Sequence, residues 1–168
     1  MHQAAFPERG LAPGQSFRHS GRVMAVFTSS PETFLVEEIP AYEPVGTGPH
    51  TFLWIEKQGL NTVEAIKRLA RALNVPERDA GYAGMKDRHA TTRQWVSVPA
   101  VDPAVALATE LLGLRVLEAR RHGNKLRIGH LRGNRFEVVL TELGDDGSAL
   151  TERLLVLGRD GLSNTYGA

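Results

Sequence analysis

Residues 81–95 are the most informative stretch of this sequence and read GYAGMKDRHATTRQW. One carboxylate, Asp87, stands here between the cations Lys86 and Arg88. Positive neighbours favour the ionised form of an acid, so the pattern predicts that Asp87 is an anion at neutral pH. The two glycines before it permit unusual backbone angles and a close approach of a ligand to the main chain. This is typical of a carboxylate offered to a polyanionic substrate, although a solvated surface turn has the same composition.

The segments before this stretch predict two strands and a helix. The chain becomes strand-like over 34–38, where alternate side chains point to opposite sides, and residues 50–57 read as a second strand that is buried on both faces. Asn61 followed by Glu64 has the spacing of a helix N-cap. Apolar residues then recur at helical spacing, and Pro76 is expected to stop this helix.

The segments after it predict more strands than helices. Strands are expected over 94–98, 115–118, 126–131 and 136–140, with Arg132-Gly133-Asn134 as a turn, and helices over 104–112 and 148–157. Because most of the strands look antiparallel, the sequence predicts an α+β fold in which helices pack on a mixed, largely antiparallel sheet.

Composition limits the class of protein. The chain has 168 residues, of which 42% are hydrophobic and 23% charged, as in an ordinary globular domain. It has no cysteine, which excludes thiolate metal sites and is compatible with a reducing cytoplasm. No paired histidines and no dinucleotide fingerprint occur, so we expect neither a metal nor a cofactor. With no signal peptide or spanning segment, we expect a cytoplasmic protein, most simply a monomer, with a flexible arm over residues 1–20.

Positive charge is concentrated between Arg115 and Arg135. This segment holds seven Lys or Arg residues and one acid, so its net charge is +6 and the rest of the chain sums to −5. A basic block within an otherwise acidic chain is the expected footprint of a face that binds nucleic-acid phosphates. The alternative is a strand edge kept soluble by its charges.

Residues 83–95 closely resemble the central motif of the TruD family of tRNA pseudouridine synthases, A-G-x-K-D-x-x-A-x-T-x-Q-W. Four further stretches resemble the family's other motifs in the same order. They are PETFLVEE at 31–38, GTGPH at 46–50, KQGLNT at 57–62 and KLRIGHLRGNRF at 125–136. Together with a final GLSNTYGA at 161–168, these motifs are spread over most of the chain from residue 21.

The resemblance implies a particular domain organisation. Family members are about twice as long, and an inserted domain splits their catalytic domain. Residues 21–168 therefore resemble the N-terminal half of a pseudouridine synthase catalytic domain, ending where the inserted domain begins. Ser163 and Thr165-Tyr166 depart from the usual proline and Tyr-Phe of the last motif, and Thr28 stands where some relatives carry a lysine.

The resemblance also implies a chemistry. Pseudouridine formation breaks the C1′–N1 bond of a uridine, turns the base and rejoins it through C5, so it needs neither a redox cofactor nor an activated water. Asp87 matches the family's catalytic aspartate. The matching positions imply that Phe136 stacks on the flipped base, that Asn134 contacts the uracil or braces the loop, and that Phe34 lines the site. From pattern alone, both phenylalanines are equally typical of a core.

Four cations complete the expected substrate-binding set: Lys86, Arg88, Arg127 and Arg132. The leading hypothesis is an isomerase that converts uridine, at position 13 of tRNA, to pseudouridine. The alternative is a truncated, inactive RNA-binding fragment of such an enzyme. An acid-catalysed hydrolase is a third reading, but no motif places a second carboxylate beside Asp87.

Overall fold

The structure is a computed structural model that describes residues 16–19, 22–143 and 147–161. The chain forms two compact units, which are described separately here. The larger unit is Ser29–Val138, and the smaller unit is formed by the chain on either side of it. All of the motifs around Asp87 lie in the larger unit.

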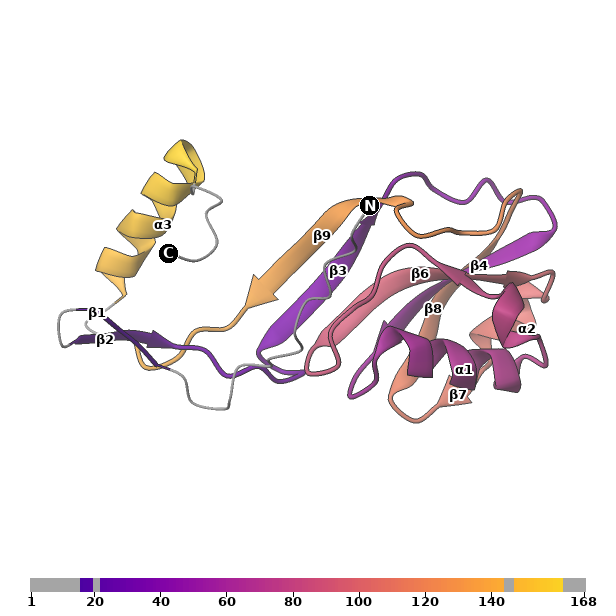
Figure 1. The fold of residues 1–168 in the computed structure, drawn as a ribbon, viewed down its shortest axis with the longest axis horizontal. Coiled ribbons are helices and arrows are strands. Elements are labelled where there is room, and N and C mark those ends of the chain that lie inside the picture. Colours follow the sequence, from indigo (N-terminus) through magenta and orange to yellow (C-terminus); the bar gives the residue numbers. More distant parts are fainter. Residues whose placement is uncertain (1–15, 20–21, 144–146, 162–168) are drawn as a thin grey trace, which may run out of the picture. The chain divides into compact units, whose positions relative to one another are not determined.

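A seven-stranded sheet forms the larger unit (Figure 1), with the strand order β7-β8-β4-β6-β3-β9 and with β5 also paired to β6. The strands are β3 (Phe34–Pro40), β4 (His50–Lys57), β5 (Gly81–Tyr82), β6 (Thr91–Pro99), β7 (Glu110–Leu111), β8 (Leu114–His122) and β9 (Leu131–Val138). Only β3 and β6 pair in parallel. The predicted α+β fold with a largely antiparallel sheet is confirmed.

The central strand β6 determines where the Asp87 loop lies. One edge of β6 pairs with β4 along its whole length. Its other edge pairs with β3 at the start, over Thr91–Arg93, and with β5 near the end, at Val96 and Ser97. The segment 83–90 connects β5 to the start of β6 and carries Asp87, so both ends of this loop are fixed by the sheet.

Helices cover one face of the sheet. Helix α1 (Thr62–Ala72) begins at the expected cap, where Asn61 Oδ1 accepts a hydrogen bond from Glu64 N at 2.8 Å. Helix α2 (Pro103–Leu107) is shorter than predicted, and η1 (Glu77–Asp79) follows α1. The core on this face is made of Leu53, Ile55, Leu60, Ala65, Ile66, Leu69, Leu73, Val96, Val98, Ala106, Leu114 and Val116. Val63 of α1 is 39% exposed and lies outside this core.

A smaller apolar cluster contains Phe52, Ala83, Trp95 and Leu126. Ala83 begins the Asp87 loop, and Leu126 belongs to the connection between β8 and β9. Gly129 N donates to Ala83 O at 2.8 Å, which joins these two loops through the backbone. The cluster therefore anchors the first residue of the loop independently of the helices.

The sequence prediction was wrong around residues 126–140. The expected turn Arg132-Gly133-Asn134 lies inside β9, which runs continuously from Leu131 to Val138. Pairing with β3, which places Ile39 opposite Gly133 and Glu38 opposite Asn134, overrides the turn tendency of the Gly-Asn pair. The strand predicted over 115–118 is also longer, because β8 follows β4 as far as His122.

The smaller unit contains an antiparallel pair, β1 (Ser16–His19) and β2 (Arg22–Val26), and the helix α3 (Ser148–Asp160). A bridge joins Val26 to Thr141. Strand β1 begins inside the expected flexible arm, and the rest of that arm lies outside the described residues, as does most of the final motif. Among the helices of the described chain, none is long and apolar enough to cross a membrane.

Candidate active site

The Asp87 loop presents its central residues to solvent and buries its flanks. Asp87, Arg88 and His89 are exposed, whereas Lys86 and Ala90 are buried. Within the described residues, the Asp87 carboxylate has no hydrogen bond or ion pair with another side chain. The loop thus offers an unengaged carboxylate from a backbone that is held on both sides.

Lys57, the last residue of β4, holds the loop backbone at Asp87. Its ammonium is completely buried, at 0% exposure. Lys57 Nζ donates to Leu60 O and Asp87 O, each at 2.7 Å, and to Lys86 O at 3.3 Å. Three donors on one ammonium are matched by three carbonyl acceptors. Lys57 is therefore a positioning residue for Asp87, and the sequence prediction missed it.

The protonation of Lys57 is linked to Asp87. Burial lowers the pKa of Lys57 to about 8, the negative charge of Asp87 acts in the opposite direction, and the charge of Lys86 lowers the pKa further. We expect the Lys57 13Cε resonance to titrate in NMR with a midpoint near pH 8. The exposed Lys67 serves as the reference, and a midpoint for Lys57 at the ordinary value of 10.5 would contradict the buried geometry.

The lowered pKa of Lys57 also determines how its contribution to the unfolding free energy changes with pH. Because the folded-state pKa is lowered, the unfolded chain binds more protons between about pH 8 and the ordinary value of 10.5. This group's contribution to the unfolding free energy therefore rises with pH in that window, by at most about 1.4 kcal/mol per pH unit.

Buried hydrogen bonds from Thr62 and Gln94 also fix the backbone of the Asp87 loop. Lys86 N donates to Thr62 Oγ1 at 2.8 Å, and Thr62 Oγ1 donates to Gln94 Oε1 at 3.0 Å. Gln94 Nε2 donates in turn to Gly84 O at 3.0 Å. Both side chains are fully buried. This chain of bonds fixes the backbone one residue before Asp87 and three residues before it.

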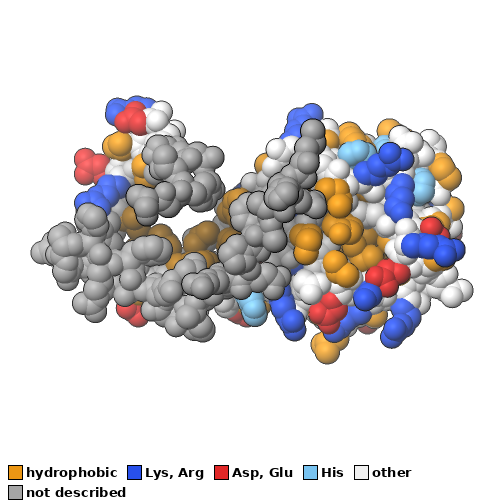
Figure 2. Space-filling view, viewed as in Figure 1, with side chains coloured by type: hydrophobic (Ala, Val, Ile, Leu, Met, Phe, Trp, Pro, Cys, Tyr) orange, Lys and Arg blue, Asp and Glu red, His pale blue; other side chains and the backbone are white. Residues whose placement is uncertain are grey.

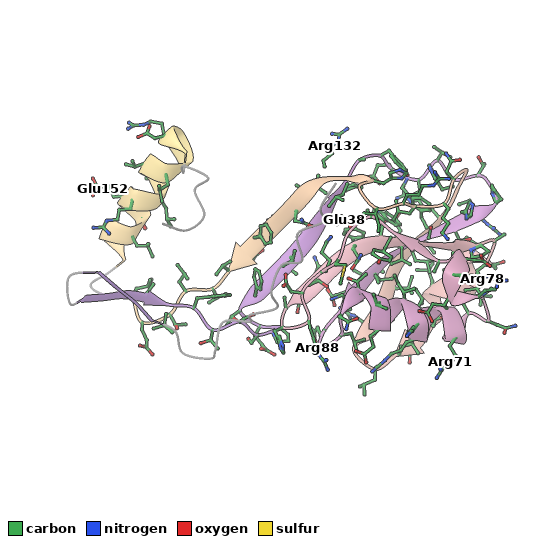
Figure 3. All side chains as sticks on the ribbon, viewed as in Figure 1. Glu38, Arg71, Arg78, Arg88, Arg132 and Glu152 are labelled. Carbon is green, nitrogen blue, oxygen red and sulfur yellow. The ribbon has the colours of Figure 1, made fainter. Side chains whose placement is uncertain are left out.

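A buried ion pair completes the support. Lys86 Nζ lies 3.1 Å from Glu38 Oε2, and the other carboxylate oxygen of Glu38 accepts a hydrogen bond from Trp95 N at 3.2 Å. Burial raises the pKa of Glu38, because desolvation outweighs the attraction of Lys86. Glu38 lies in the interior between β3 and the loop (Figure 3).

This geometry corrects the role expected for Lys86. The sequence suggested that Lys86 and Arg88 flank Asp87 and contact the substrate. Lys86 is instead buried against Glu38, where a substrate phosphate cannot reach its ammonium. The buried cation that holds the Asp87 backbone is Lys57. The sequence carried a signal for Lys57, which begins the KQGLNT motif at 57–62, but the motif did not indicate this role.

The expected base-binding residues lie on β9 and β3, next to this support. Asn134 is directly opposite Glu38, and Phe136 is opposite Val36. Opposed residues of antiparallel strands share one face, so both side chains lie on the face that carries Glu38. The rings of Phe34 and Phe136 are stacked, with centroids 6.1 Å apart and planes at 14°. Phe136 is 58% exposed and so is not a core residue.

Asn134 has a further property that bears on its expected role. Its Oδ1 atom is buried and has no hydrogen-bond partner within the described residues. A buried acceptor without a donor is unfavourable, by about 1–3 kcal/mol, unless a ligand supplies the donor. An ordered water or an N–H group of a bound molecule can supply this donor.

The basic residues are distributed less uniformly than the sequence suggested. Arg115 pairs with Glu56 at 2.5 Å and Arg120 pairs with Glu118, so part of the block is neutralised internally. Arg88, Arg127 and Arg132 are exposed. Figure 3 shows Arg88 and Arg132 pointing away from the sheet on different sides of the larger unit. The two arginines do not form one patch, and Arg127 lies on a separate loop.

Within the described residues, no group of three or more His, Asp or Glu side chains is arranged to hold a metal ion. Asp87, Phe136 and Asn134 contribute an exposed carboxylate, an exposed aromatic ring and an amide oxygen that is unpaired within these residues.

Comparison with known proteins shows the family to which this chain belongs. The sequence matches the family model of tRNA pseudouridine synthase D (TruD) over residues 18–168. The chain belongs to this TruD family, as the motifs around Asp87 indicated.

Individual relatives agree. The chain is 52% identical over 143 residues to tRNA pseudouridine synthase D from Geobacter sulfurreducens, covering 84% of this chain and 35% of the relative. It is 54% identical over 140 residues to the Anaeromyxobacter sp. protein of the same name, covering 82% and 39%. The crystal structure of a candidate tRNA pseudouridine synthase D from Methanosarcina mazei superposes with a TM-score of 0.73, at 26% identity, over 86% of this chain and 34% of that one. The chain thus spans roughly a third of the length of these proteins.

Proposed function

We propose that this chain is the Asp87-bearing part of an enzyme that isomerises uridine to pseudouridine in tRNA, with the uridine at position 13 as target. The single observation that carries the proposal is the exposed Asp87 carboxylate on a loop whose backbone is fixed by Lys57 and by the Glu38–Lys86 pair. Membership of the TruD family supports tRNA as the partner and the cytoplasm as the place of action.

The carboxylate acts on the sugar in this proposal. Asp87 either attacks C1′ of the ribose as a nucleophile or removes a ribose proton, and in both cases the C1′–N1 bond breaks with its electrons leaving on the uracil. The base turns, and a bond forms between C1′ and C5. As that bond forms, the bond between Asp87 and C1′ breaks or the ribose proton is returned. C5 then loses its proton to solvent while N1 gains one, so no atom is gained or lost overall. Lys57 keeps Asp87 at a fixed backbone position throughout.

The neighbouring side chains suit a uracil that has left the RNA stack. The exposed ring of Phe136, backed by Phe34, offers a stacking platform worth about 1–3 kcal/mol per base. The unpaired Oδ1 of Asn134 can accept the N3–H of uracil. Arg88 remains available for a phosphate near Asp87, because its side chain points into solvent.

A second candidate function is RNA binding without turnover. It is favoured by one observation, namely that the chain spans only 35% of the length of a relative to which it is 52% identical. The remaining part of such proteins would then be needed to complete the cleft.

Tritium release from tRNA that carries 5-[3H]uridine distinguishes isomerase activity from RNA binding without turnover. We expect a full-length protein containing this sequence to release tritium with unmodified tRNA, and not with tRNA in which uridine 13 is replaced by cytidine. The 168-residue chain is assayed in parallel. Release by the longer protein alone would assign RNA binding to this chain, and release by neither would contradict the proposed isomerase.

A further inference from the structure

A cluster of basic residues lies outside the Asp87 loop. A cavity of about 430 Å³ in the larger unit is lined by His50, Gly123, Asn124, Lys125, Arg127 and His130. Four of these six residues are cationic or can become so, and the lining includes no acid. Figure 2 shows His side chains next to Lys and Arg side chains over the loop that joins β8 to β9. Such a lining favours an anion.

The walls of this cavity are held in place by other residues. His130 Nδ1 and Tyr42 Oη are 2.7 Å apart, and the Tyr42 ring stacks on His122 with centroids 5.2 Å apart. His122 is the cross-strand partner of His50. Lys125 Nζ donates to Arg78 O at 2.8 Å, which orients the ammonium and leaves two of its protons for a ligand. Lys125 and His130 are therefore positioned before any anion arrives.

One atom of the wall lacks a partner. His50 Nδ1 is buried and makes no hydrogen bond within the described residues. This ring nitrogen is therefore the polar atom of the wall that a ligand or its bound water would satisfy.

The cavity is physically connected to the Asp87 loop. Its floor, the segment 123–130, donates from Gly129 N to Ala83 O, four residues before Asp87. The segment is packed so closely on β5 that a Cβ on Gly81 would lie 2.2 Å from Leu126 O. The segment 123–130 is thus fixed to the start of the Asp87 loop, so a ligand that reached both places, such as a polynucleotide strand, would meet two segments held relative to each other.

We propose that this cavity binds a backbone phosphate of the RNA whose uridine is presented to Asp87. The inference rests on the proposed function and adds to it a contact that fixes the position of the strand away from the reacting nucleotide. Phosphate contacts of this kind set register and orientation without reading the sequence. Arg127, which the sequence assigned to substrate binding, acts in this cavity together with Lys125, His50 and His130.

The test is filter binding of unmodified tRNA to the 168-residue chain across a salt series. Replacing Lys125 and Arg127 together by alanine is expected to weaken binding at least about tenfold at low salt and to make the log–log salt slope shallower by about 1.5–2. The matched control removes two cations, Lys67 and Arg71, that line a cavity of about 410 Å³ beside α1. The control should bind like the unaltered chain. Equal losses in both variants, or no loss in the first, would overturn the proposal.

Two further measurements test whether the loss of binding arises in this cavity. The variant His50→Gln removes the unpaired nitrogen with little change in volume, and thermal unfolding of each variant shows whether it is folded. Inorganic phosphate is titrated against the His50 and His130 ring signals in NMR. Phosphate that shifts these signals and competes with tRNA supports the proposal. Phosphate that shifts them while tRNA affinity stays unchanged in the Lys125/Arg127 variant would make the cavity a site for a free anion and overturn it.

The binding readout separates this proposal from the function proposed for Asp87. Loss of RNA affinity in the Lys125/Arg127 variant would sustain the phosphate site even if tritium release were absent. Tritium release that is unaffected by the same variant at low tRNA concentration would remove the phosphate site and leave the isomerase intact.

Discussion

Replacing Asp87 by asparagine is expected to abolish pseudouridine formation by the full-length protein. The change keeps the size of the side chain but removes the charge and the nucleophilic oxygen, and loss of a single reacting group of this kind lowers kcat by about 10⁴-fold or more. Tritium release at saturating tRNA measures kcat directly. Affinity for tRNA should change little, because the carboxylate is one exposed group among many contacts.

The folded state should tolerate this change. The Asp87 carboxylate makes no hydrogen bond or ion pair to another side chain in the described part of the chain, so the midpoint of urea unfolding is expected to stay the same. One internal signal should nevertheless move. The charge of Asp87 raises the pKa of Lys57, so Asp87→Asn should shift the Lys57 titration to below its value of about 8.

The control for Asp87→Asn is Glu110→Gln. Glu110 is an exposed carboxylate on the edge strand β7, at the other end of the strand order from β3 and β9. The substitution Glu110→Gln removes the same charge and leaves the Asp87 loop unchanged. Turnover above about a tenth of normal in Asp87→Asn would show that another group performs the chemistry.

Removal of the Glu38 charge is expected to give the largest loss of stability. Glu38→Gln keeps an acceptor for Trp95 N but leaves the buried ammonium of Lys86 without a counter-charge. Breaking a buried pair on one side typically lowers the unfolding free energy by about 3–5 kcal/mol. Urea unfolding at neutral pH measures the loss. Because Lys86 precedes Asp87, tritium release should fall as well.

A double-mutant cycle checks that the pair causes this loss. The variant with Glu38→Gln and Lys86→Met has no unpaired charge and should be more stable than the sum of the two single changes implies. Lys86→Met alone leaves a carboxyl whose pKa burial already raises. Its folded state then retains a proton that the unfolded chain releases, so its stability should fall as pH rises.

An exposed ion pair provides the comparison. Glu64 and Arg68 lie 2.6 Å apart on the surface of α1. Glu64→Gln should change the unfolding free energy by less than about 1 kcal/mol, because solvent screens such pairs. A loss as large as that of Glu38→Gln would mean that burial does not explain the effect.

The features that could be predicted from the sequence are those whose interacting residues lie close together along the chain. The helix start at Asn61 was predictable, because its cap bonds to a backbone N–H only three residues away. The strand over residues 50–57 was predictable from its apolar composition alone. The identity of Asp87 as the central residue followed from a motif in continuous sequence.

Interactions between distant segments were not predictable in the same way. Glu38 is 48 residues from Lys86, and Lys57 is 30 residues from Asp87. No local pattern indicates that a lysine next to an aspartate will turn inward to a third residue. Likewise, Gly133-Asn134 has the composition of a turn, and only its pairing with β3 makes it part of a strand.

The polar centre beneath Asp87 also restricts how such a protein can vary over evolutionary time. Segments that are far apart in the chain contribute Glu38, Lys57, Thr62, Lys86 and Gln94, and each depends on an atom supplied by another segment. A substitution at one of these positions leaves a hydrogen-bond donor or acceptor without its partner. Most single substitutions are therefore harmful unless a second, compensating substitution accompanies them. We therefore expect strong epistasis among these five sites and drift at exposed neighbours such as Met85.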